Sequence, residues 1–166
     1  MDPAAARVAA LRLLARREFG SAELESRLRE KGFGADVLAD LIQELREERL
    51  LDDLRYATSY VRNHAGRGQG PRRIRMGLKE AQLPDALITE ALESAPDFHA
   101  IARSLRVRRF GAELPADWPE RARQSRFLQY RGFSNDHIAS ALASAGDDAP
   151  SLDLDFDDLT PDDDIP

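Results

Sequence analysis

Basic side chains gather around a glycine-rich loop in the middle of the chain, Gly66–Gly70. No acidic residue lies between them, and together they number four arginines and one lysine: Arg67, Arg72, Arg73, Arg75 and Lys79. Guanidinium and ammonium groups presented around the start of a helix can bind phosphates. Arginine forks can equally well pair with the carboxylates of an acidic protein groove. The sequence therefore predicts a surface for a polyanion and leaves open which one.

Two further arginine clusters follow in the chain. The second, which we expect to form an additional contact patch, contains Arg106, Arg108 and Arg109. The third contains Arg121, Arg123, Arg126 and Arg131. Arginine is also a good helix former, so a solvated arginine-rich face is the alternative interpretation. The spread of clusters along the chain favours binding of a polyanion.

The charge of the chain is segregated. The formal net charge is −6, but nine aspartates and no Lys or Arg lie in residues 147–166, and without them the chain carries +3. Such asymmetry suggests a polyanionic partner and an acidic tail able to compete with it. The alternative is a mixed-charge surface with a solubilising tail.

The residues that enzymes use are poorly placed. The chain has no cysteine, so it offers no disulfide or thiolate metal site. His64, His99 and His137 fall on three different predicted helices without the ligand spacing of a metal site. The glycine loop follows a helix, whereas phosphate-binding loops follow a strand. The pair Asp52-Asp53 is explained as a helix cap. We expect no catalysis, no metal and no cofactor.

The chain repeats itself with a period of about fifty residues. Apolar positions recur in three sets: Leu24, Leu28, Phe33, Leu38, Ile42; Ile74, Leu78, Leu83, Ile88, Leu92; and Gln124, Leu128, Phe133, Ile138, Leu142. The polar Gln124 is the clearest departure from this pattern, so the third set is the least regular. Each set has helical spacing with a turn in its middle, and a further amphipathic helix precedes it. A fixed period of this length indicates tandem copies of one supersecondary unit.

The predicted fold is therefore all-α, with three tandem three-helix repeats at residues 4–50, 51–96 and 97–146. One repeat alone is close to the size at which a single core stops being sufficient. We expect the repeats to stack into an elongated, curved array. Residues 147–166 have no helical face and form a predicted disordered acidic tail.

Local signals place some helix starts. Ser21 is predicted as the N-cap of one helix. Trp118, which follows Asp117 and precedes Pro119, is predicted to pack as a hydrophobic staple at the start of another. Tyr130 is interpreted as a packing residue, and base stacking is the alternative for Tyr130 and for Trp118. No apolar run approaches the roughly 20 residues that span a bilayer, so we expect a cytoplasmic protein without membrane contact.

Three stretches of the chain resemble the RecX family of regulatory proteins. The first runs from Ser21-Ala22-Glu23-Leu24 to Lys31-Gly32-Phe33, and the second joins Leu50-Leu51-Asp52-Asp53 to Gly70-Pro71-Arg72-Arg73-Ile74. The third runs from Arg126-Phe127-Leu128 to Arg131-Gly132-Phe133-Ser134. The resemblance covers about residues 5–145 in the family's order.

The resemblance implies a non-enzymatic regulator of recombination and DNA repair, connected with the SOS response. It implies a monomer that binds the RecA filament on single-stranded DNA and inhibits its growth and activities. Arg67, Arg72, Arg73 and Arg75 are assigned to the contact surface by hypothesis, with Arg106, Arg108 and Arg109 as a second patch. The alternative is a free-standing helical DNA-binding module without RecA selectivity.

The acidic tail allows three interpretations. It is a solubilising segment, an autoinhibitory mimic of DNA charge, or a docking peptide. The run Asp162-Asp163-Asp164-Ile165-Pro166 resembles the acidic tip of bacterial single-stranded-DNA-binding proteins, but the phenylalanine that ends that tip is missing.

Overall fold

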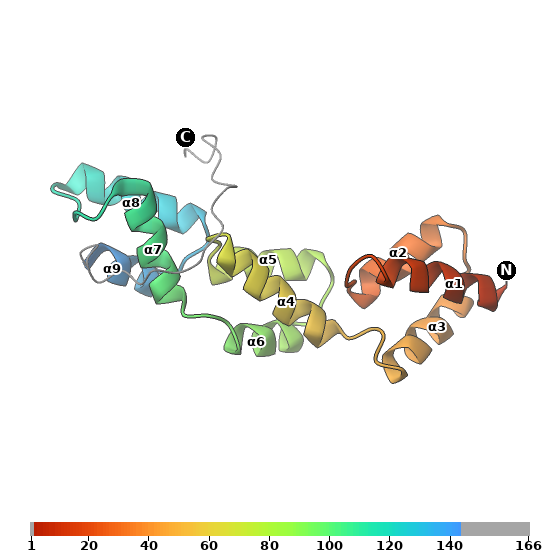
Figure 1. Ribbon diagram of the computed structural model, residues 1–166. Helices are drawn as coiled ribbons and strands as arrows, with labels where there is room; N and C mark the ends of the chain where they lie inside the picture. Colours follow the sequence, from red (N-terminus) through yellow and green to blue (C-terminus); the bar gives the residue numbers. More distant parts are fainter. Residues whose placement is uncertain (1, 144–166) are drawn as a thin grey trace. The chain divides into compact units, whose positions relative to one another are not determined.

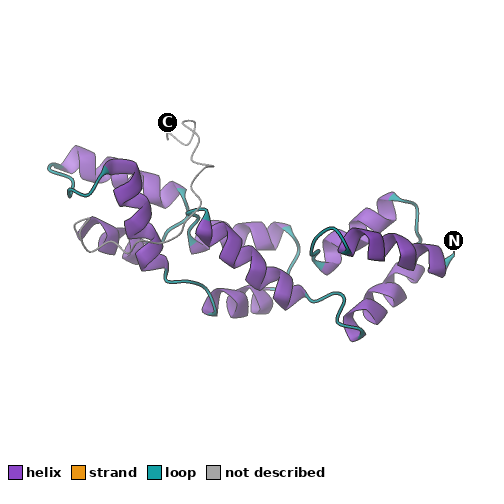
Figure 2. Cartoon of the chain, viewed as in Figure 1, coloured by secondary structure: helices purple, strands orange, loops and turns teal. Residues whose placement is uncertain are grey.

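The computed structural model describes residues 2–143, and every regular element in that range is a helix (Figures 1 and 2). The helices are α1 (Pro3–Leu14), α2 (Ser21–Glu30), α3 (Ala35–Glu47), α4 (Asp53–Gly66), α5 (Pro71–Glu80), α6 (Asp85–Glu93), α7 (Phe98–Phe110), α8 (Trp118–Tyr130) and α9 (Asn135–Ala143). The prediction of an all-α fold is confirmed. The predicted tail, 147–166, lies outside the described residues. None of the described helices has the length and apolar character needed to cross a membrane.

The fifty-residue period is visible in the turn between the second and third helix of each repeat. One residue of each turn has a left-handed backbone: Gly32 (φ 91°), Gln82 (φ 61°) and Gly132 (φ 94°). The next residue donates its N–H to a carbonyl five positions earlier, at 3.1–3.3 Å in all three turns. The acceptors are fully buried leucines, namely Leu28, Leu78 and Leu128. This hydrogen bond closes the helix end and fixes where the next helix begins.

The contacts divide the chain into two compact units. The first unit contains residues up to Ser59 together with Leu78–Ala91, and the second contains Tyr60–Gly77 together with the residues from Leu92 onward. Helices α4, α5 and α6 of the middle repeat therefore contribute residues to both units. The array shape expected from the sequence stays a prediction.

In the first unit, α1, α2 and α3 pack against one another. Their core includes Leu24, Leu38 and Leu45, which are fully buried. The prediction that Ser21 caps α2 is wrong by one residue. Gly20 holds the N-cap position, and it has no side chain that could accept a capping hydrogen bond. The Asp53 carboxylate instead accepts a hydrogen bond from the Ser21 N–H at 2.7 Å.

In the second unit, α9 packs against both α7 and α8 (Figure 1). The interior is formed by Ile101 and Leu105 of α7, Leu128 of α8, and Phe133 and Ile138 at the start of the last helix, all at most 6% exposed. Helix α8 of this unit carries Arg121, Arg123 and Arg126 of the third arginine cluster.

Candidate polyanion-binding surface

The glycine-rich loop between α4 and α5 is bonded to the turn between α8 and α9. The Gly70 N–H donates to the Arg131 carbonyl at 2.8 Å, and the Arg72 N–H donates to the Gly132 carbonyl at 3.0 Å. A Cβ on Gly70 would lie 2.3 Å from the backbone of Gly132, and one on Gly132 would lie 2.6 Å from Arg73. Two glycines therefore meet where no side chain fits.

We call this connection the joint and define it by the backbone bonds of Gly70 and Arg72 to Arg131 and Gly132. The Arg131 side chain adds further hydrogen bonds to it. Arg131 is 4% exposed, and its guanidinium donates through Nη2 to the Arg67 carbonyl at 2.7 Å and through Nε to the Gly68 carbonyl at 3.2 Å. A charge held between carbonyl oxygens fixes the loop more firmly than neutral hydrogen bonds would. Arg131 was grouped with the surface arginines from the sequence, and the structure corrects this: it is an internal residue of the joint.

The joint presents the first arginine cluster beside α8. Arg67 and Arg72 are exposed, and Arg73 and Arg75 are half-buried. The Arg73 guanidinium lies over the ring of Tyr130, with the guanidinium carbon 5.8 Å from the ring centroid. Tyr130 itself is 52% exposed, so its ring is open to a ligand in spite of this contact.

The third cluster continues from Tyr130 along α8. Arg126 and Arg123 precede Tyr130 by four and seven residues, so helical geometry puts the three side chains on one face. Both arginines are exposed. Arg123 also lies over Phe110, 5.3 Å from the ring centroid, and forms an ion pair with Glu120 at 3.3 Å. That exposed pair adds little to stability.

Helix α7 adds one arginine of the second cluster to this face. The Arg109 guanidinium lies 5.7 Å from the centroid of the Phe127 ring, and that ring meets Phe110 edge-on at 5.3 Å. We call the resulting surface of the second unit the arginine strip, and define it by Arg72, Arg73, Arg109, Arg123, Arg126 and Tyr130. The strip joins residues that are up to 58 positions apart in sequence.

Arg106 does not belong to any surface. It is 0% exposed, and its Nη1 donates to the carbonyls of Gly111 at 3.4 Å and Glu113 at 3.0 Å. Burial lowers the pKa of its guanidinium from the usual value. The assignment of Arg106 to a contact patch is therefore corrected, because its side chain holds the loop after α7 and is closed to a partner.

The other predicted contact residues are dispersed. Lys79 is exposed, belongs to the first unit and forms an ion pair with Asp85 at 3.3 Å. Arg108 is exposed on α7. The strip also contains Arg126, which the sequence groups in the third cluster without assigning it to the contact surface, and Tyr130, which the sequence favours as a packing residue. The spacing of four residues predicts that these two side chains share a face of α8, whereas the approach of Tyr130 to Arg73 depends on the joint.

Residues considered for catalysis have structural partners. The Asp52 carboxylate accepts from the Arg55 N–H at 2.9 Å and caps α4, as predicted. The Ser134 N–H donates to Nδ1 of His137 at 3.3 Å, and the His137 N–H donates to Oγ of Ser134 at 3.4 Å. This reciprocal arrangement at the start of α9 is that of a helix cap. His99 packs edge-on against His137 at 4.5 Å. Among the described residues no group of three metal-binding side chains is assembled.

Comparison with known proteins places the chain in a family. Models of the RecX family match three consecutive segments: the first three-helix domain at residues 6–45, the second at 52–92 and the third at 97–142. The chain belongs to the RecX family. The resemblance seen in the sequence is thereby confirmed, and so is the tandem order of three three-helix domains.

Relatives named "Regulatory protein RecX" are similar over most of their length. The protein of Halorhodospira halophila is 46% identical over 145 residues, which covers 87% of this chain and 90% of that RecX. The RecX of Vibrio vulnificus is 39% identical, with 81% and 88% covered. The RecX of Pseudomonas savastanoi pv. phaseolicola is 42% identical, with 88% and 95% covered.

A solved RecX structure has the same fold. The crystal structure of RecX from Lactobacillus salivarius superimposes with a TM-score of 0.75 at 24% identity, covering 85% of this chain and 94% of that one. At this identity the similarity supports the fold. The family name describes a regulatory protein.

Proposed function

We propose that this chain is a regulator of the RecA recombinase that binds the RecA filament on single-stranded DNA and restrains its growth and activities. It acts as a cytoplasmic monomer, without catalysis or cofactor, in recombination, DNA repair and the SOS response. Membership of the RecX family supports the regulatory role. One structural observation supports the mode of binding: the Arg73 guanidinium lies beside the exposed Tyr130 ring.

The arginine strip has the composition of a single-strand binding surface. Aromatic rings stack on bases, and neighbouring arginines meet the phosphates of the same strand. Arg72 and Arg126, both exposed, flank Tyr130 and Arg73 on α5 and α8. The same guanidinium groups can pair with carboxylates on a RecA surface. We assign Arg67, Arg75, Lys79 and Arg108 to further contacts with the filament.

Several weak contacts suffice for such a partner. A filament repeats its surface at every protomer, so contacts made by different domains of one chain add up to a high apparent affinity. The phosphate contacts depend on salt, because they release counterions. The affinity for the filament should therefore have two contributions. Contacts with DNA phosphates give a contribution that falls as the salt concentration rises, and contacts with RecA give one that is present only when RecA is bound.

A free-standing DNA-binding module is the second candidate. The arginine strip favours it equally, because a strip that binds phosphates does not need RecA. A three-helix reader of duplex DNA would place basic residues on its third helix. Neither α6 nor α9 contains a lysine or an arginine, and this counts against a major-groove reader.

The two candidates are separated by one experiment. The full chain is titrated onto fluorescent single-stranded DNA, bare or coated with RecA and a slowly hydrolysed ATP analogue, and RecA ATP hydrolysis is measured in parallel. We expect tighter binding to the filament and a falling hydrolysis rate. Equal binding to bare DNA, with hydrolysis unchanged, would favour the free-standing module.

A further inference from the structure

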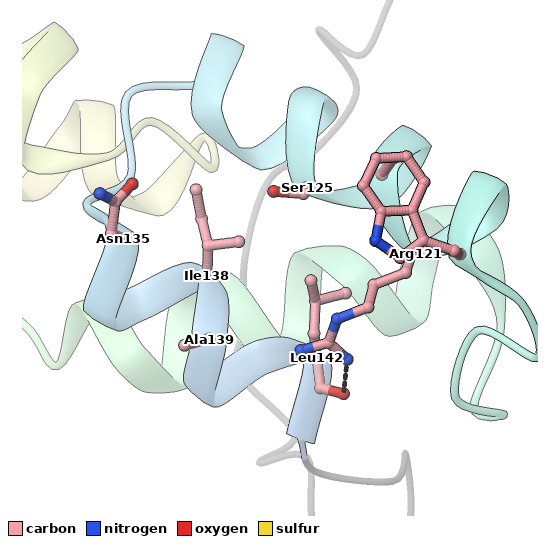
Figure 3. A pocket seen from close by; sticks show the side chains of 8 residues that line it. Arg121, Ser125, Asn135, Ile138, Ala139 and Leu142 are labelled. Carbon is pink, nitrogen blue, oxygen red and sulfur yellow. Dashed lines mark hydrogen bonds between the residues drawn. The ribbon is translucent and has the colours of Figure 1, made fainter.

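A groove lies between α8 and α9, on a different face of α8 from the arginine strip. Its volume is about 310 Å³. Ile138, Ala139 and Leu142 line it from α9, and Arg121 faces them from α8 (Figure 3). The Arg121 guanidinium donates to the Leu142 carbonyl at 3.5 Å. The floor of the groove is thus apolar, and a cation stands at the end where α9 stops.

The same groove contains Trp118. The predicted hydrophobic staple is wrong for this residue, because its side chain is 77% exposed. The start of α8 is fixed instead by Asp117, whose carboxylate accepts from the Glu120 N–H at 2.9 Å. An exposed indole over an apolar groove is costly in water and is typical of a surface that becomes covered. Trp118 is also the only tryptophan of the chain.

The chain continues beyond the cationic end of the groove. Residues 144–166 follow directly after Ala143 and two positions after Leu142, whose carbonyl accepts from Arg121. Its sequence Leu152-Asp153-Leu154-Asp155-Phe156-Asp157 alternates apolar and acidic residues. In extended form such a segment has one apolar and one acidic face. Leu152 is ten residues beyond Leu142, a reach of up to about 33 Å.

Charge complementarity points in the same direction. Helix α8 carries Arg121, Arg123 and Arg126 against a single acidic residue, Glu120. The segment beyond α9 carries nine aspartates and neither lysine nor arginine. A tether this short gives a millimolar effective concentration, so even weak contacts keep such a segment bound.

We propose that residues 144–166 of this chain dock into the α8–α9 groove. Leu152, Leu154 and Phe156 cover Trp118, and the alternating aspartates face Arg121. The bound segment places negative charge on the helix that carries the arginine strip and competes there with a polyanion. The docking stands by itself, whereas the competition rests on the proposed function.

Trp118 fluorescence in the full chain tests the docking. We expect blue-shifted emission and weak quenching by acrylamide in the wild type. The triple variant Leu152→Ser, Leu154→Ser, Phe156→Ser should have red-shifted emission and at least about twofold stronger quenching, since the indole returns to water. The control Ala149→Ser, in the same segment, should behave as the wild type. Identical emission and quenching in the wild type and the triple variant would overturn the proposal.

A second variant tests the groove from the other side. Ala139 is exposed on α9 and lines the groove, so Ala139→Glu puts an acid against the acidic segment. It should reproduce the red shift of the triple variant. Ala86→Glu, on an exposed position of α6, is the matched control. A blue shift that appears only at high protein concentration would show docking between copies and would overturn docking within one chain.

The competition is measured separately. Binding of the triple variant and of the wild type to bare single-stranded DNA is compared at low salt. The triple variant should bind at least about fivefold more tightly, the lower end of typical coupling between sites. If the fluorescence differs and DNA affinity is equal, the groove binds the segment but does not regulate the strip. If both proteins fail to bind DNA or filament, the proposed function fails and the docking result remains.

Discussion

The backbone N–H of Gly70 donates to the carbonyl of Arg131 at 2.8 Å, and this bond makes the glycine-rich loop a packing element. In the sequence, the glycines next to arginines predict a loop that binds a polyanion. In the structure, the backbone of this loop is hydrogen-bonded to the turn after α8. Glycine is needed at positions 70 and 132 because the two backbones approach each other closely there. Arg73 of α5 obtains its position beside Tyr130 from this joint.

Replacing Gly70 should therefore disrupt the second unit. In Gly70→Ala the new methyl group would lie 2.3 Å from the Gly132 backbone, and we expect a loss of about 3 kcal/mol in the free energy of unfolding. The matched control is Gly66→Ala, where an added Cβ meets no described atom within 4 Å. It should be neutral or stabilising by up to about 1 kcal/mol. Urea denaturation followed by circular dichroism measures both; equal midpoints would contradict the packing role.

Two arginines of α7 should behave in opposite ways. Arg106 is buried and bonded to loop carbonyls, so Arg106→Leu should reduce the unfolding free energy by about 2–3 kcal/mol. Arg108 is exposed, so Arg108→Leu should leave stability within about 0.5 kcal/mol and weaken filament binding instead. Thermal melts and filament titrations of the two variants are compared. A stable Arg106→Leu protein with weakened binding would restore Arg106 to the contact surface.

His64 is held in an environment that favours the neutral imidazole. Its ring stacks on Tyr60 at 3.8 Å and its Nδ1 lies 3.0 Å from Oε1 of Gln69. Burial lowers the pKa of His64; the Gln69 hydrogen bond opposes this effect, while Arg67 adds a smaller lowering. Burial likewise lowers the pKa of His137. In both cases the folded state binds a proton less readily than the unfolded chain.

Acidification should consequently destabilise the fold. With both folded-state pKa values depressed below the ordinary value of 6.5, the unfolded state binds more protons as the pH falls through that value. The free energy of unfolding should be constant near pH 7.5 and decline between pH 7 and about 5, before most carboxylates titrate. Urea midpoints across this range measure the slope. His64→Gln should flatten it, and an unchanged slope would contradict the role of burial.

Tyr130 provides a test of stacking. Tyr130→Ala should weaken binding to the RecA filament by about tenfold or more, because stacking on one base contributes about 1–3 kcal/mol. Tyr130→Phe should retain most of the affinity. Since the ring is 52% exposed, neither change should lower the melting temperature much. Equal loss in both variants would assign the effect to the hydroxyl group and contradict stacking.

Local patterns were enough to predict much of the fold. The period of fifty residues predicted three-helix units, and the turns at Gly32, Gln82 and Gly132 have the same backbone form. Helical spacing and capping are short-range effects, so they can be read from neighbours in the sequence. The start of α2 was displaced by one residue, because the group that binds the Ser21 N–H comes from Asp53, far along the chain.

The candidate site was less predictable. Charge marks an arginine as a possible ligand of phosphate, but it does not tell whether the side chain is exposed. Arg106 and Arg131 are buried because nearby carbonyls accept their hydrogen bonds, and those carbonyls are placed by tertiary packing. Tyr130 and Arg73 meet across 57 residues of sequence. No local pattern encodes such a meeting.

Charge reversal on the strip tests the central proposal most directly. The side chains of Arg72 and Arg126 are both exposed. The joint uses only the backbone N–H of Arg72, which a substitution to Glu keeps, so Arg72→Glu with Arg126→Glu should fold normally. The control reverses Arg12 and Arg16 to Glu, two exposed arginines of the α1 region, with the same change in net charge.

Binding to RecA on single-stranded DNA is measured by fluorescence anisotropy at two salt concentrations. We predict at least about a hundredfold loss of affinity for the strip variant, from the loss of two phosphate or carboxylate contacts, and little change for the control. Equal binding by the two variants would contradict it.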